Sequence, residues 1–317
     1  MGAAPAGARG PSREGRDEST EDLETMDVAT GLLSRARRML PEGPKALLRR
    51  FLVRKVAPYD EHELGVYVLQ RAEEFCKGRG GHPEALQAVR LRKSILRQRH
   101  LEHTSEAHQY LQTAFMPDYE QSLFEYYQQQ QFLMLLAFLG YPFRGPGCLC
   151  SHVDPFLVAS SRLPGIRALD YGAGIPYGLI HLLRTCPEKI ESITIVDLDL
   201  VHTELSEYIL SQLAPDKEIT FLRITDAESV PDLGGRAFNL IYGKDIFEHV
   251  HDPERLLRVM LDRAAPSCLA YFDIRDHGAK YLQHVHPQLS HLSRVVCERS
   301  FKSDGQVGGL SEFVRNA

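Results

Sequence analysis

The stretch RALDYGAGIPYG, residues 167–178, places a short apolar run directly before a glycine-rich turn. Gly172 and Gly174 lack a Cβ atom, so the backbone can adopt positive φ and approach a ligand closely. A dinucleotide-binding turn follows the pattern G-x-G-x-x-G, but Tyr177 occupies the position of the third glycine. Asp170 precedes the turn, and its negative charge would repel a pyrophosphate. The turn therefore favours a ligand with a cationic end over a dinucleotide.

The chain around this turn has the pattern of an α/β protein. After residue 165, short β-rich runs alternate with amphipathic segments, which predicts a Rossmann-like parallel sheet with helices on both faces. Ligands of such sheets bind beyond the carboxyl ends of the strands, and the glycine turn follows the first predicted strand. The predicted strands span 166–171, 193–199, 219–226, 238–245 and 268–274, and the predicted helices span 175–186, 202–214 and 253–264.

Acidic residues also end the next two predicted strands. In ITIVDLDL, residues 193–200, the Asp197 carboxylate is placed to accept hydrogen bonds from both hydroxyls of a ribose. Asp199 competes for this role, and we prefer Asp197 because it directly follows the apolar run. Asp226 ends the third strand, where it suits either the amino group of an adenine or a turn.

Four stretches together resemble a known family. DYGAGIPYG, VDLD, TDAESV and FNLIYGKDIFEHVHDPERLL stand in the order and spacing of the class I S-adenosylmethionine-dependent methyltransferases. The tract IFEHVHDPERLL is similar to the small-molecule branch that includes ubiquinone-biosynthesis-type enzymes. The resemblance covers roughly residues 165–275 and implies a seven-stranded sheet with a reversed last strand. It also implies a methyltransferase that uses S-adenosylmethionine and acts on a small organic acceptor.

The resemblance assigns a role to several positions of this chain. Asp170, Gly172 and Gly174 would surround the methionine part of the cofactor, and Asp197 would bind the ribose. Lys244 and Asp245 would line the methyl-transfer face. The full predicted cofactor set is Asp170, Tyr171, Gly172, Ala173, Gly174, Asp197, Leu198, Asp226, Ala227 and Lys244.

The predicted catalytic residues come from the loop after the fourth strand. Transfer of a methyl group to oxygen or carbon calls for a base, and His249 and Asp245 are our candidates by position, with His251 beside them. For His249 a structural role at a helix start is slightly favoured over a catalytic one. The chain departs from the family at Ile175-Pro176, after the second glycine. It departs again at Asn239, where an acid is usual.

The N-terminal half has a different composition. Residues 1–24 contain almost no large apolar side chain, which predicts a disordered tail. Residues 25–163 are expected to form a helical lid or substrate domain before the catalytic domain at 164–317. Its predicted helices lie near 47–56, 64–75, 83–96 and 119–139, the last ending at Gly140-Tyr141-Pro142. Tyr126 and Tyr127 of the last helix suit an aromatic substrate, although core packing is the commoner fate.

The composition and the N-terminal sequence predict a cytoplasmic protein. The net charge is −5, which gives no general attraction to nucleic acid or to an anionic membrane. The apolar stretch FLMLLAFLGY, residues 132–141, is shorter than the ~20 residues that a membrane-spanning helix needs. The N-terminus has no apolar core of signal-peptide length, so the six cysteines are expected to be reduced thiols. The sequence indicates no oligomeric state.

Two histidine-containing clusters invite a metal interpretation that we do not favour. Cys148-x-Cys150-x-His152 has no second cysteine pair to complete a zinc site, so we expect a loop leading into the sheet. A second cluster follows the fifth strand, where a solvated helix face is expected: His277, His284, His286 and His291. We therefore predict no metal.

Basic segments support a second class of acceptor. Residues 34–55 hold eight Lys or Arg and one acid, and a second basic patch comprises Arg90, Arg92, Lys93, Arg97 and Arg99. A methyltransferase acting on RNA or protein through these helices is one alternative, although solvated faces of a lid are favoured. A non-catalytic partner subunit that keeps the fold is another. A nicotinamide-dependent reductase is disfavoured by Tyr177.

Overall fold

The computed structural model describes residues 59–78, 83–97, 131–225, 230–276 and 288–315. All of these belong to one compact unit, Pro41–Ala317. The predicted tail at 1–24, the helix at 47–56, and Tyr126 with Tyr127 lie outside the described residues.

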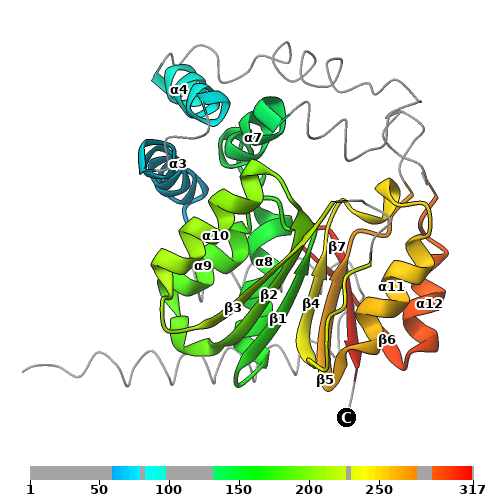
Figure 1. Cartoon of the computed structure of the whole chain (residues 1–317). Coiled ribbons are helices and arrows are strands. Elements are labelled where there is room, and N and C mark those ends of the chain that lie inside the picture. The colour runs from blue at the N-terminus through cyan, green and yellow to red at the C-terminus, as the bar shows by residue number, and fades with distance from the viewer. Residues whose placement is uncertain (1–58, 79–82, 98–130, 226–229, 277–287, 316–317) are drawn as a thin grey trace, which may run out of the picture. The chain divides into compact units, whose positions relative to one another are not determined.

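A seven-stranded sheet forms the centre of this unit, with the order β3-β2-β1-β4-β5-β7-β6 (Figure 1). Strands β1 to β5 pair in parallel, whereas β7 lies antiparallel between β5 and β6. This arrangement confirms the predicted Rossmann-like sheet and its reversed last strand. The strands are β1 (Ile166–Tyr171), β2 (Ile190–Leu198), β3 (Glu218–Ile224), β4 (Phe238–Gly243), β5 (Ala264–Phe272), β6 (Phe301–Val307) and β7 (Leu310–Arg315).

Helices cover both faces of the sheet because alternate strand residues point to opposite sides. In β4, Leu240 and Tyr242 join the core that contains α8, α9 and α10, whereas Ile241 joins the core that contains α11 and α12. The three predicted helices of this region are confirmed. The helices are α8 (Cys150–Arg162), α9 (Tyr177–Thr185), α10 (Val201–Leu213), α11 (Pro253–Asp262) and α12 (Leu292–Glu298), with short turns η2 (Pro187–Lys189) and η3 (Phe247–His249).

Helices also precede the sheet, as predicted. The described part of this region contains α3 (Glu61–Gly78), α4 (Pro83–Arg97), α7 (Gln131–Gly140) and the turn η1 (Tyr141–Phe143). Buried apolar residues of α3 recur at helical spacing and join the same core as α8 to α10, including Leu64, Val68 and Phe75. Among the described residues, no helix combines the length and apolar character required to cross a bilayer.

The loop predicted around Cys150 and His152 is wrong, because α8 begins at Cys150. Pro155 lies inside this helix and cannot donate a hydrogen bond to the carbonyl of Ser151. The Tyr242 hydroxyl, from β4, donates to that carbonyl at 3.0 Å instead. A contact with the sheet thus compensates for the proline, and local sequence does not reveal it.

A buried ionic contact ties α8 to the antiparallel strand. Glu312 of β7 is fully buried, and Arg162 Nη1 lies 2.5 Å from its Oε1. The Tyr271 hydroxyl, from β5, donates to the same oxygen at 3.1 Å. The end of α8 is therefore anchored to the part of the sheet formed by β5 and β7.

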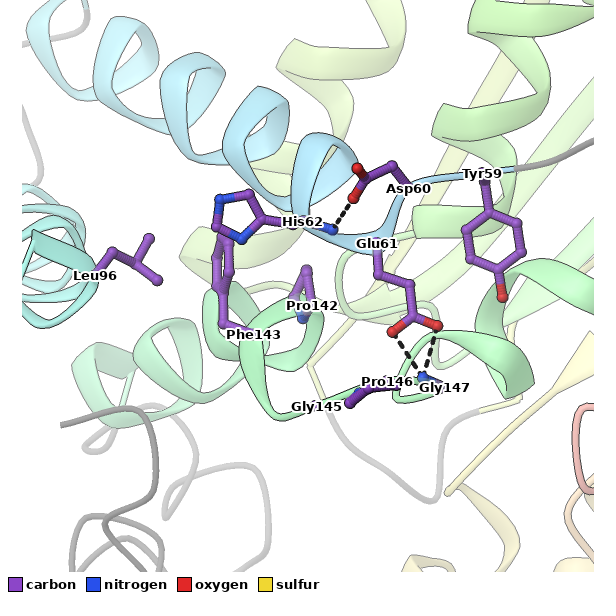
Figure 2. A pocket seen from close by; sticks show the side chains of 10 residues that line it. All are labelled: Tyr59, Asp60, Glu61, His62, Leu96, Pro142, Phe143, Gly145, Pro146 and Gly147. Carbon is purple, nitrogen blue, oxygen red and sulfur yellow. Dashed lines mark hydrogen bonds between the residues drawn. The ribbon is translucent and has the colours of Figure 1, made fainter. Parts of the chain in front are cut away.

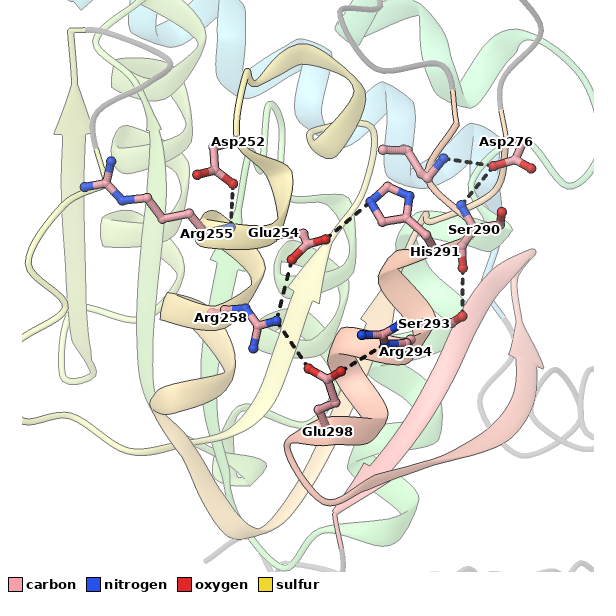
Figure 3. A network of polar contacts seen from close by, with 11 residues as sticks. Asp252, Glu254, Arg255, Arg258, Asp276, Ser290, His291, Ser293, Arg294 and Glu298 are labelled. Atoms are coloured by element: carbon pink, nitrogen blue, oxygen red, sulfur yellow. Dashed lines mark hydrogen bonds and ion pairs between the residues drawn. The ribbon is translucent and has the colours of Figure 1, made fainter.

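Helices α11 and α12 are joined by exposed charges (Figure 3). Arg258 of α11 contacts Glu254 at 3.5 Å and Glu298 of α12 at 3.2 Å, and Arg294 contacts Glu298 at 3.0 Å. His291 lies 3.8 Å from Glu254, so it belongs to this surface network. The other three histidines of the predicted cluster lie outside the described residues.

Asn239 has a structural role at the amino ends of the strands, opposite the ends that carry the glycine turn. Its Oδ1 accepts from the Arg167 backbone N–H at 2.8 Å, and its Nδ2 donates to the Gly165 carbonyl at 2.7 Å. These contacts join the beginnings of β1 and β4. The departure from the family's usual acid therefore falls at the amino ends of the strands, away from the glycine turn.

Candidate functional site

The predicted site residues gather at the carboxyl ends of β1, β2 and β4. The strand order reverses between β1 and β4. Strands β2 and β3 are added on one side of β1, and β4 and β5 on the other. Such a switch point is the usual ligand site of an α/β sheet. The structure places there Asp170 to Gly174, Asp197 with Leu198, and Lys244 with Asp245. Asp226 and Ala227 lie outside the described residues.

The glycine turn after β1 depends on both of its glycines. Gly172 has φ +69° and Gly174 has φ +54°, values that side chains with a Cβ disfavour. A Cβ atom at Gly172 would lie 2.0 Å from Cγ2 of Ile246, so there is no room for one. The positive φ that the sequence predicted is present at both glycines, and the turn carries no side chain at these two positions.

The Asp197 carboxylate is tied to this turn. Its Oδ2 accepts from the Gly174 N–H at 2.6 Å, and its Oδ1 accepts from the Leu198 N–H at 2.7 Å. Asp199 points elsewhere: its carboxylate contacts Arg223 at 2.8 Å on an exposed surface. The geometry thus puts Asp197, rather than Asp199, against the glycine turn.

Asp170 is a buried acid with an unsatisfied oxygen. Its side chain is 1% exposed, and Oδ1 has no hydrogen-bond partner among the described residues. Burial, and secondarily the nearby charge of Asp197, raise the pKa of Asp170 well above its ordinary value. A cation placed here would stabilise the carboxylate. The bare turn and two neighbouring acids therefore fit a ligand that carries both a positive charge and hydroxyl groups.

Helix α7 covers the turn. A Cβ atom at Gly174 would lie 3.1 Å from the Phe138 ring, and the Tyr177 hydroxyl donates to the Phe138 carbonyl at 2.9 Å. At the other end of α7, Gln131 Oε1 accepts from the Val201 N–H at 3.0 Å. The sequence predicted Phe138 only as one apolar position of a helix, so this contact with the glycine turn was missed.

An ion pair follows β4, on the side predicted for methyl transfer. Lys244 contacts Asp245, and its Nζ lies 5.8 Å from the centre of the Tyr141 ring. Desolvation disfavours the charged form of each partner, but the attraction between the two charges outweighs desolvation. This attraction raises the pKa of Lys244 and lowers the pKa of Asp245 to about 2. The pair adds little net charge beside the turn.

Solved methyltransferase structures provide the comparison for the fold of this chain. An O-methyltransferase family protein from Burkholderia thailandensis matches with a TM-score of 0.50 and 12% identity, over 66% of this chain and 70% of that chain. This chain has the class I methyltransferase fold. A putative O-methyltransferase from Nostoc punctiforme matches with a TM-score of 0.45 and 13% identity, over 66% and 68% of the two chains. No protein-family model and no curated protein matches the sequence.

His152 lies on the same side of this methyltransferase fold as Lys244, although the sequence predicted it in a loop. Its ring contacts the Tyr141 ring at 5.2 Å and the Tyr177 ring at 6.2 Å. Burial and the positive charge of Lys244 lower its pKa to about 3. His152 is therefore neutral at physiological pH. Its position depends on α8, which local sequence does not indicate at this point of the chain.

The two predicted catalytic residues lie close in the chain but differ in character. Asp245 has φ +53° and is a weak base because its pKa is near 2. His249 ends the turn η3, and its Nε2 lies 3.9 Å from Oε1 of Glu248. Glu248, which precedes His249, is buried, with 1% of its surface exposed.

Glu248 should make stability depend on pH. Burial, and then the negative charge of Asp245, raise its pKa from an ordinary 4.5 to about 8. The folded protein keeps a proton that the unfolded chain releases, so the free energy of unfolding falls as pH rises from about 4.5 to about 8. The full loss is at most roughly 5 kcal/mol, because one pKa unit corresponds to about 1.4 kcal/mol. Glu248→Gln cannot release this proton and should remove that slope.

Urea unfolding of wild type and Glu248→Gln at several pH values between 5 and 8 measures this effect. Glu188→Gln, in the exposed turn η2, is the control and should keep the wild-type slope. Parallel pH profiles for wild type and Glu248→Gln would contradict the raised pKa.

A cavity of about 560 Å³ lies elsewhere (Figure 2). It is bounded by the start of α3, by Leu96 of α4 and by the segment around η1, and its walls include Tyr59, His62 and Phe143. Glu61 at its edge accepts from the Gly147 N–H at 2.9 Å. None of the predicted cofactor residues that the structure describes lines this cavity. The candidate site therefore lies at the carboxyl ends of the strands, beside the glycine turn.

Within the described ranges, no three His, Cys, Asp or Glu side chains come close enough together to hold a metal ion. Cys150 instead lies 4.0 Å from Glu61 and is buried. His152 faces Tyr141 and Tyr177.

The second basic patch is partly used inside the protein. Arg92 donates to the Leu136 carbonyl at 2.7 Å, and burial together with Arg144 lowers its pKa to about 10. Lys93 forms an ion pair with Glu73 of α3. Arg90 is exposed. Arg92 and Lys93 therefore connect helices, which leaves a smaller basic surface than the sequence suggested.

Proposed function

We propose that this protein is an S-adenosylmethionine-dependent methyltransferase that acts on a small organic acceptor. The observation that carries the proposal is the bare glycine turn between two buried acids, Asp170 and Asp197, at the switch point of the sheet. The same stretches of sequence resemble the small-molecule branch of the family. The solved structures contribute the fold alone.

The proposed cofactor contacts follow from charge and position. Asp170 would face the ammonium and sulfonium groups, and Asp197 would accept from the ribose hydroxyls. Tyr171, Gly172, Ala173 and Gly174 supply the backbone that the cofactor approaches. For the adenine end we propose Asp226 and Ala227, and Leu198 and Lys244 complete the set.

The sulfonium of the cofactor supplies an electrophilic methyl group, which an acceptor atom displaces in line. The protein's contribution is to position the acceptor and exclude water. Phe138 covers the turn, and the pairing of Lys244 with Asp245 limits repulsion of the sulfonium. We propose His249 as the base. The low pKa of Asp245 suits it to hold Lys244 more than to take a proton.

We propose that residues 25–163 form the lid or substrate domain and that the protein acts in the cytoplasm. Contacts of α7 with the glycine turn support the lid, and the composition supports the location. A polymer acceptor has less support, because Arg92 and Lys93 are engaged with other parts of the protein.

Calorimetric titration with S-adenosylmethionine, S-adenosylhomocysteine and NADH tests the proposal. Both adenosyl compounds should bind with micromolar affinity, and NADH should not bind. Asp197→Ala should weaken binding at least tenfold, because hydrogen bonds to a charged group contribute about 1.5 to 3 kcal/mol. Asp199→Ala is the matched control, since Asp199 contacts Arg223 instead of the turn.

Absence of binding by both adenosyl compounds would overturn the proposal. It would favour a non-catalytic subunit that retains the fold. Equal weakening by Asp197→Ala and Asp199→Ala would refute the assignment of the ribose to Asp197.

A further inference from the structure

We infer that His202 is a positioning residue that orients the Asp197 carboxylate toward ribose hydroxyls and couples it to helix α7. This inference rests on the proposed function, because it concerns the affinity for the cofactor. It assigns a role to a residue that would not itself touch the cofactor.

His202 is buried beside the carboxylate. It lies in the first turn of α10 and is 2% exposed. Its Nε2 lies 3.4 Å from Oδ1 of Asp197, a polar contact that is longer than the usual range of hydrogen bonds. An imidazole is costly to bury without a polar partner, and Asp197 is such a partner. The position therefore calls for a polar side chain more than for one that only fills volume.

The two oxygens of Asp197 have different surroundings. Oδ2 accepts from the Gly174 N–H, so it is bound to the glycine turn. Oδ1 accepts from the Leu198 N–H and faces His202. Two backbone groups hold the carboxylate close to the sheet, and His202 is a side chain that can adjust the direction of Oδ1. A ribose offers two hydroxyl groups, so its recognition depends on how both oxygens are directed.

Phe138 packs against the His202 ring. The two ring centres are 5.0 Å apart with an edge-to-face tilt of 63°, a favourable aromatic geometry. The same Phe138 ring would be 3.1 Å from a Cβ atom at Gly174, so it spans the distance between the turn and His202. Tyr177 holds the backbone of Phe138 from α9.

Helix α7 contacts the first turn of α10 at both ends. Gln131, at its start, accepts from the Val201 N–H, and Phe138, near its end, packs on His202. A shift of α7 would move two adjacent residues of α10 together. The affinity of Asp197 for a ribose is thereby linked to the position of α7.

The experiment compares two ligands that differ by one hydroxyl. S-adenosylhomocysteine and its 2′-deoxy analogue are titrated into the full-length chain by calorimetry. If one ribose hydrogen bond to a carboxylate contributes about 1.4 kcal/mol, wild type should prefer the complete ribose about tenfold. The variants are His202→Gln, His202→Phe and Phe138→Leu, with His181→Phe as the matched control. His181 is also buried, on α9, but its ring contacts Tyr59.

His202→Phe should reduce the tenfold preference to about threefold or less, because roughly 0.7 kcal/mol of orientation is lost. Its affinity for the deoxy analogue should stay near that of wild type. His202→Gln keeps a polar group and should retain most of the preference. Phe138→Leu, which removes the aromatic contact without touching Asp197, should reduce the preference at least partly. His181→Phe should leave it unchanged.

An unchanged preference in His202→Phe and Phe138→Leu would overturn the inference. So would an equal loss of affinity for both ligands, which is the result of a purely structural role. Should His202→Phe not fold, Phe138→Leu decides by the same ratio. A wild-type protein that binds neither ligand would instead refute the proposed function itself.

Discussion

Gly172→Ala is expected to lower the free energy of unfolding by roughly 2 to 4 kcal/mol and to abolish cofactor binding. Two causes act together. At φ +69° a Cβ atom strains the backbone, and the new methyl group would lie 2.0 Å from Cγ2 of Ile246. Relief of the overlap would move either the turn or the loop that carries Lys244 and Asp245. Urea unfolding and titration with S-adenosylhomocysteine measure the two effects.

Gly309→Ala separates strain from overlap. Gly309 has φ +88°, but nothing lies within 4 Å of a Cβ atom placed there. This variant should lose only about 1 kcal/mol of stability and keep its affinity for the ligand. Equal losses of stability in Gly172→Ala and Gly309→Ala would show that the Ile246 contact does not contribute. Normal ligand binding by Gly172→Ala would contradict the role of the bare turn.

Glu312→Ala is expected to destabilise the protein by roughly 3 to 5 kcal/mol, because it removes one partner of a buried ion pair. The Arg162 guanidinium and the Tyr271 hydroxyl would both lose the carboxylate oxygen that they share. Arg162 is 25% exposed and would regain some water, which places the effect nearer the lower value. Thermal and urea unfolding give the measurement.

Two further variants define what Glu312 contributes. Glu312→Gln keeps an acceptor oxygen and should lose clearly less than Glu312→Ala. Glu298→Ala removes exposed contacts to Arg258 and Arg294 (Figure 3) and should cost less than about 1 kcal/mol. A similar loss for Glu312→Ala and Glu298→Ala would contradict the importance of burial.

The parts of the site that sequence could predict are those in which one residue type meets a local backbone requirement. Gly172 and Gly174 belong to a turn that needs positive φ, and Asp170 and Asp197 stand where predicted strands end. The parallel sheet could be predicted equally well from the sequence, because strand and helix periodicities alternate over short distances along the chain. Each of these inferences depends on residues that are near neighbours in the chain.

Phe138, His152 and His202 could not be recognised in this way. Their apolar or amphipathic spacing is what any packed helix shows, and their roles arise from contacts with distant segments. Phe138 meets the glycine turn only because α7 crosses the strand edge, and His152 faces Lys244 only because α8 extends to it. Pro155 concealed α8 further, because its compensating contact comes from β4.

The position of β7 restricts the order in which this sheet can assemble. Strand β6 is made before β7, yet it reaches the rest of the sheet through β7, which pairs with β5 on its other side. A nascent or truncated chain that stops before residue 310 would hold β6 without its neighbour and β5 with an open edge. The core would lack Phe313, and Arg162 would lack the Glu312 carboxylate with which it forms an ion pair. Completion of the fold therefore waits for its last strand, and shortened chains should be targets for chaperones and proteases.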